Sequence, residues 1–182
     1  MTQITGDLKL VVPIRDGFSA YHTPISREVY DHCFRVLRDA KVDLIGTSAR
    51  HAFAARGDAA LYLREAGRKL AADGGEDGGA SALLVDLKRL TMVLVPTDQG
   101  FSTMPVDAAI SAGKMKADEW SDVESSIVFF TCWLSGTPRK DIPTEANLAA
   151  SLIGGSMTSL TAMEWAASLK TSTTATASTA PI

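Results

Sequence analysis

A chain of 182 residues with ordinary apolar content is most simply one domain, and it is long enough to bury a substantial core. The formal net charge of -3 and the scattered Lys and Arg side chains argue against nucleic acid as a partner. The longest apolar run, residues 127–134, is too short to span a bilayer, and the first residues lack a secretory pattern. We therefore expect a cytoplasmic protein with no membrane partner.

Two β-type runs, residues 7–14 and 17–25, predict an N-terminal hairpin. Asp16-Gly17 separates the runs, and glycine accepts the positive φ that a tight turn needs. Pro13 lacks a donor for a strand ladder, so the first strand is an edge or ends there. Because two strands alone are marginal, we expect this hairpin to lean on helices or to pair with another subunit.

Residues 17–39 hold two of the three histidines and one of the two cysteines, which raises the question of an active site. Ser26 instead predicts a helix N-cap, and Cys33 falls in the middle of the apolar stripe that follows. His32 lies about 100° round the helix from Cys33, which is poor geometry for a thiolate–imidazole pair. No Cys/His spacing typical of zinc follows. The segment is interpreted as a helix start, with no catalytic residue, metal site or cofactor.

The rest of the chain predicts helices. We expect one or two helices over residues 47–72, a solvated connection at 73–79, and the strongest amphipathic helix at 80–95. We expect a loop at 96–105, helices at 106–113 and 117–136, a turn at 137–143 and a short helix at 144–155. A last helix at 159–169 has a possible capping box formed by Thr161 and Glu164. The predicted fold class is therefore mainly α: a helical domain (1–169) with a small N-terminal β-hairpin (7–25) and a flexible Ser/Thr/Ala-rich tail (170–182).

No motif of known chemistry occurs in the sequence. It lacks a nucleophile elbow, a Walker motif, a dinucleotide fingerprint and a Cys-x-x-Cys pair. Cys33 and Cys132 both fall in apolar helical patterns and are interpreted as reduced core thiols. The sequence therefore predicts a protein that is not an enzyme. A small-ligand or redox-sensing regulator that uses the two cysteines is a further alternative.

The chain resembles the tail assembly chaperones of long-tailed (siphovirus-type) bacteriophages. The resemblance covers roughly residues 7–172 and rests on "HTPISREVYDHCFRVLRDAKVDL", on the stretch from "EDGGASALLVDLKRL" to "SSIVFFTCW", and on "SMTSLTAMEWAASLKTST". It implies a protein of the host cytoplasm that binds the tape-measure protein and recruits tail tube protein during tail morphogenesis, with no catalysis. We also consider self-association of the chain. The alternative is a structural virion protein of the neck, head-tail junction or tail.

Four apolar side chains are the predicted partner-binding residues. Extended helices dock through spaced apolar anchors, and Trp and Met are favoured at such surfaces. The residues are Trp133, Met163, Trp165 and Leu169.

Overall fold

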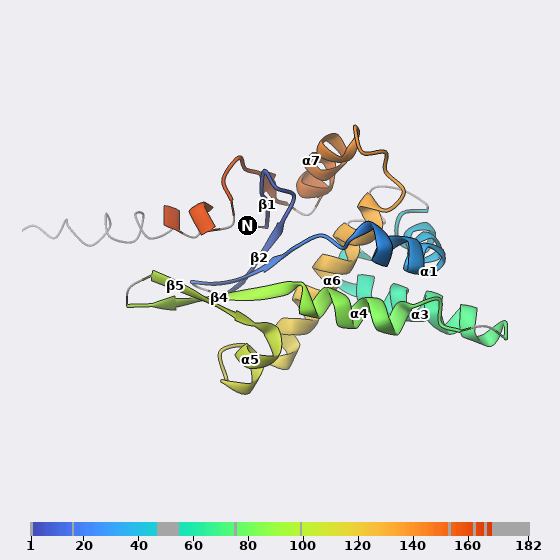
Figure 1. Cartoon of the computed structure of the whole chain (residues 1–182), viewed down its shortest axis with the longest axis horizontal. Helices are drawn as coiled ribbons and strands as arrows, with labels where there is room; N and C mark the ends of the chain where they lie inside the picture. Colours follow the sequence, from blue (N-terminus) through green and yellow to red (C-terminus); the bar gives the residue numbers. More distant parts are fainter. Residues whose placement is uncertain are drawn as a thin grey trace, which may run out of the picture.

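A mixed six-stranded sheet and the helices that pack on it form the fold (Figure 1). The computed structural model describes residues 2–15, 17–46, 55–74, 76–98, 100–152, 154–161, 163–165 and 167–168. The strands follow the spatial order β5-β4-β3-β2-β1-β6, and neighbours are antiparallel except for β1 and β6. The strands are β1 (Gln3–Ile4), β2 (Leu10–Arg15), β3 (Phe18–His22), β4 (Thr91–Thr97), β5 (Gly100–Pro105) and β6 (Ser156–Met157). The helices are α1 (Arg27–Ile45), the 3₁₀ turn η1 (Arg56–Asp58), α3 (Ala59–Ala72), α4 (Ala80–Arg89), α5 (Val106–Ser111), α6 (Ala117–Leu134) and α7 (Ile142–Leu152).

The N-terminal hairpin is confirmed, but it is not the whole sheet. β2 and β3 pair through Val11 and Tyr21, and Gly17 has the positive φ of 77° that the turn needs. β1 pairs with β2 only at Leu10 and Val11, so β2 is an edge where Pro13 lies. The position of Pro13 therefore agrees with its missing donor. On its other side, β3 pairs with β4 from the middle of the chain.

The predicted fold class, a mainly α domain with a small hairpin, is wrong. The structure is an α/β fold with a mixed six-stranded sheet. The helix predicted over residues 80–95 ends at Arg89, and β4 begins at Thr91. The loop predicted over residues 96–105 contains β5, which pairs with β4 along its whole length.

The error at β4 has a physical cause. A strand that is covered on both faces loses the alternation of apolar and polar residues and becomes a continuous apolar run. Val93 and Val95 face the main core, whereas Leu94 belongs to a second apolar cluster on the opposite face. Because Leu87 lies directly upstream with helical spacing, the strand and the preceding helix merge into one pattern.

Most of the predicted helices are confirmed near their predicted boundaries. Ser26 caps α1, because its hydroxyl oxygen accepts a hydrogen bond from the backbone N–H of Val29. The acidic first turn of α6 is present, and the carboxylate of Glu119 accepts from the backbone N–H of Lys116 at 2.7 Å. Residues 73–79 connect α3 to α4 as predicted, and the Asp77 carboxylate accepts from two backbone N–H groups at the start of α4.

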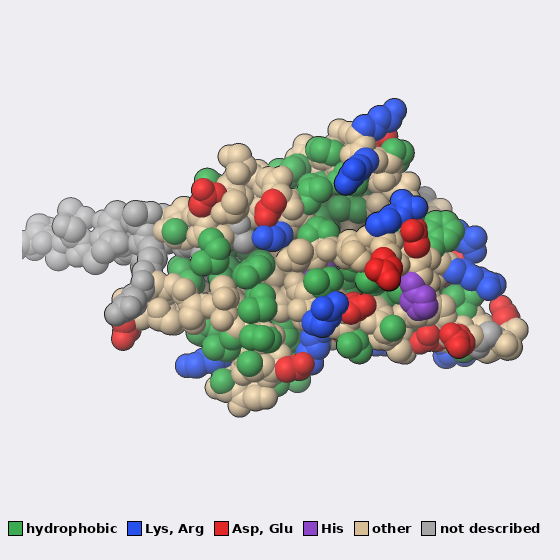
Figure 2. All heavy atoms as spheres, viewed as in Figure 1, with side chains coloured by type: hydrophobic (Ala, Val, Ile, Leu, Met, Phe, Trp, Pro, Cys, Tyr) green, Lys and Arg blue, Asp and Glu red, His purple; other side chains and the backbone are tan. Residues whose placement is uncertain are grey.

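The two faces of the sheet differ in what covers them. Helices α1, α3, α4, α6 and α7 contribute buried side chains to one core with the inner face. On the outer face, Trp165 from the C-terminal segment packs with Val11 and Leu94. None of the described strand residues whose register places them on this face is charged: Gln3, Val11, Pro13, Ser19, Tyr21, Met92, Leu94, Pro96, Phe101, Thr103, Pro105 and Ser156. Figure 2 shows hydrophobic side chains gathered over the strands.

Candidate functional site

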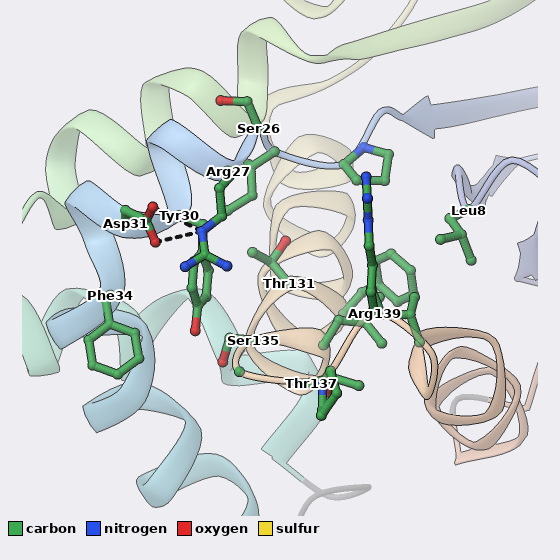
Figure 3. A pocket seen from close by; sticks show the side chains of 17 residues that line it. Leu8, Ser26, Arg27, Tyr30, Asp31, Phe34, Thr131, Ser135, Thr137 and Arg139 are labelled. Carbon is green, nitrogen blue, oxygen red and sulfur yellow. Dashed lines mark hydrogen bonds and ion pairs between the residues drawn. The ribbon is translucent and has the colours of Figure 1, made fainter.

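An open groove of about 1190 Å³ lies between the start of α1 and the end of α6 (Figure 3). Phe130 of α6 lines it and is only 2% exposed, whereas Phe34 of α1 is 47% exposed. The rings of Tyr30 and Phe34 meet edge to face with their centroids 5.9 Å apart. The partly exposed apolar lining consists of Leu8, Ile25, Tyr30, Phe34, Leu134 and Ile142. The groove therefore presents an apolar surface that the chain itself does not fully cover.

Leu8 has an unusual backbone conformation at one side of this groove. Its φ is 62°, and it is the sole residue other than glycine with a positive φ in the part of the chain that the structure describes. The turn that holds it closes through Thr5, whose carbonyl accepts from Leu8 N–H at 2.8 Å and whose hydroxyl accepts from Lys9 N–H at 2.9 Å. A left-handed leucine costs about 1–2 kcal/mol, which the surrounding turn must offset.

The end of α6 is fixed against α1, so the opposite wall of the groove is well defined. The ammonium group of Lys41 donates to the carbonyls of Trp133 at 2.8 Å and of Ser135 at 2.7 Å. These are helix-end acceptors that have no partner within their own helix. Gly136 follows with a φ of 74°, and a Cβ at this position would lie 3.7 Å from the Tyr30 hydroxyl. Glycine therefore provides the turn beside Tyr30.

The charged groups at the groove leave one cation without a partner. Arg27 and Asp31 form an ion pair at 2.8 Å across one turn of α1. Arg139 is exposed and has no ion-pair partner among the described residues. Figure 3 shows its side chain extending into the groove between Leu8 and Thr131. The groove therefore carries a net positive charge.

The three predicted partner-binding residues that the structure describes do not come together in one surface. Trp133 is 8% exposed and donates from its indole N–H to Glu145 at 3.0 Å. Trp165 is also 8% exposed and lies in the cluster on the outer face of the sheet. Met163 is 51% exposed, and Leu169 lies outside the described residues. Contact of these residues with a partner stays a prediction.

Neither cysteine and neither of the two described histidines lines the groove. Cys33 and Cys132 are both buried, and burial raises the pKa of Cys132 to about 12 and also raises the pKa of Cys33. His32 is exposed, His22 is buried, and His51 lies outside the described residues. Among the residues that are described, no three His, Cys, Asp or Glu side chains gather closely enough to hold a metal ion.

Sequence reasoning missed the groove for a local reason. Phe34 lies beside the buried stripe of α1 in the sequence, but this residue is 47% exposed and lines the groove. Leu8 carries no signal, because nothing in the sequence indicates a leucine with positive φ. Arg139 was assigned only to a turn. A large apolar residue at the margin of an amphipathic stripe was the one available indication.

Comparison of the chain with known protein families, with curated proteins and with solved structures finds no match in any of the three. In the part of the chain that is described, no helix combines the length and the apolar character needed to cross a membrane.

Proposed function

We propose that this protein is a tail assembly chaperone of a long-tailed bacteriophage, which binds the tape-measure protein and recruits tail tube subunits in the host cytoplasm. The resemblance of residues 7–172 to that family supports the proposal. The carrying observation is the open, partly exposed apolar groove, because a protein that holds a client needs a surface that its own core leaves uncovered. The proposed activity is binding, with no catalysis and no cofactor.

A structural virion protein of the neck, the head-tail junction or the tail is the second candidate. Such a protein makes permanent contacts with its neighbours. The uncharged outer face of the sheet favours this candidate, because a face without charged side chains is suited to stable packing against another subunit. The two candidates differ in whether the protein leaves the finished particle.

The test is co-expression with the tape-measure and tail tube proteins of the same phage. We expect the folded protein to retain both in a pull-down and to raise the soluble fraction of the tape-measure protein. Mass spectrometry of purified virions provides the second measurement, and a chaperone should be absent from them. If neither protein is retained or solubilised and the chain is found in virions, the structural-component function replaces the chaperone function.

A further inference from the structure

We infer that the groove between α1 and α6 is the docking site for an amphipathic helical segment that carries apolar anchors and an acidic residue, the acid being placed opposite Arg139. This inference rests on the proposed function, because it names the surface through which the chaperone holds its client. The client segment is identified by its chemistry: a short helix with one apolar face flanked by a carboxylate.

The size and lining of the groove suit a helix. The wall that α1 provides runs from Ser26 to Phe34, which corresponds to roughly 12 Å of helix axis. Two to three turns of a docked helix match this length, and its anchors at i, i+3 and i+4 face one side. The exposed ring of Phe34 is the largest uncovered apolar side chain there, and aromatic side chains commonly dominate the binding energy of such surfaces.

The charges at the groove select an acidic partner. Asp31 is already paired with Arg27, so it contributes little to the net field. Arg139 remains available, and its planar guanidinium binds a carboxylate through two parallel hydrogen bonds. A basic helix would place a like charge beside Arg139. Electrostatic complementarity therefore distinguishes an acidic amphipathic helix from a basic one of equal apolarity.

The strained backbone at Leu8 is the third indication that the groove binds a helix. A left-handed leucine is unfavourable for the isolated fold, and such strain is commonly retained where a side chain serves binding. Figure 3 places Leu8 across the groove from Phe34, so the two residues bracket the proposed helix. Asparagine tolerates positive φ better than leucine. A Leu8→Asn variant therefore separates the conformational role of this position from its apolar contact.

The first experiment compares groove variants with matched variants elsewhere in the pull-down of the tape-measure protein. We expect Phe34→Ala, Arg139→Glu and Leu8→Asn to stay folded and to weaken binding at least about tenfold. The controls are Leu61→Ala, an exposed leucine on α3, and Arg35→Glu, an exposed arginine on α1 outside the groove. If all three groove variants are folded and bind as wild type does, the inference is overturned and the proposed function still stands.

A second experiment does not depend on the client. Two peptides of about three helical turns share the same apolar face and carry either Glu or Lys beside it. Nuclear magnetic resonance of the full chain should show shifts of the backbone amides of Tyr30, Phe34 and Gly136 with the Glu peptide, and weaker ones after Arg139→Glu. If both peptides cause equal shifts, or if these amides do not shift, the inference is rejected. This result does not depend on whether the protein is a chaperone.

Discussion

The buried imidazole of His22 makes the stability of the fold depend on pH. Its Nδ1 lies 3.0 Å from the hydroxyl of Thr91, which itself donates to the carbonyl of Leu87 at 2.7 Å. The hydroxyl proton is thus used, so Nδ1 carries a proton and donates to the Thr91 oxygen. Nε2 is buried without a hydrogen-bond partner among the described residues. Burial lowers the pKa of His22 from 6.5 to about 4, because the core does not solvate an imidazolium.

This arrangement predicts a stability loss in mild acid. The unfolded chain binds a proton at His22 near pH 6.5, but the folded chain binds this proton only near pH 4. The stabilising contribution is therefore fully present above pH 6.5 and is lost progressively down to about pH 4, by roughly 3 kcal/mol in total. Urea unfolding of wild type and His22→Gln across this range measures it.

The control for that titration is His32→Gln, which removes an exposed histidine from α1. We expect this variant to follow the wild-type pH dependence of the free energy of unfolding, whereas His22→Gln flattens it. A His22→Gln variant with an unchanged slope would show that carboxylates cause the acid sensitivity instead.

Cys132 is predicted to matter for packing and not for reactivity. Its side chain is 0% exposed on α6, and burial raises its pKa to about 12, so the thiolate is scarce at neutral pH. We expect Cys132→Ala to lower the free energy of unfolding by about 1–2 kcal/mol and to leave client binding intact. A thiol-reactive reagent that labels native Cys132 rapidly, or a binding loss in a fully stable variant, contradicts this expectation.

Residue-level prediction from the sequence succeeded where the chemistry is local. The capping box of the last helical segment is present, since Glu164 accepts from the Thr161 backbone N–H at 2.8 Å and the Thr161 hydroxyl accepts from Glu164 N–H. Ser26 was identified for the same reason. The residues of the groove depend on contacts between distant segments, and single-residue preferences do not encode such contacts.

At the scale of elements, the hydrophobic period identified helices better than strands. α1 buries one stripe against the core, so its period of 3.6 residues is clear. α6 is central and buries side chains around most of its circumference, including the consecutive residues 127–130. β4 is central and buried on both faces, so its period of two residues is hidden. β5 contains Gly100 and ends at Pro105, which resembles a loop in the sequence, and pairing with β4 overrides this preference.

At the scale of the whole molecule, the C-terminal segment covers part of the outer face of the sheet. Trp165 packs with Val11 and Leu94, and Tyr21 and Phe101 lie against this cluster. The sequence predicted Trp165 as a partner-binding residue, and it did not indicate the sheet face that this residue covers, because the sheet itself was not predicted. The protein thus has two separate apolar surfaces, a sheet face that Trp165 partly covers and an open groove.

Trp165 is predicted to contribute to the stability of the fold. We expect Trp165→Ala to lower the free energy of unfolding by about 3 kcal/mol, because the outer face of the sheet loses its main cover. The matched variant Met163→Ala truncates a neighbouring side chain that is 51% exposed and should stay within about 0.5 kcal/mol of wild type. Urea unfolding at neutral pH measures both values.

The same pair of variants distinguishes the two surfaces. If the groove holds the client, Trp165→Ala protein that remains folded should bind the tape-measure protein as wild type does, because Trp165 does not line the groove. The opposite result, wild-type stability combined with lost binding, would mean that the C-terminal segment is itself a client surface. The buried position of Trp165 would then belong only to the client-free protein, and the site predicted from the sequence would be restored.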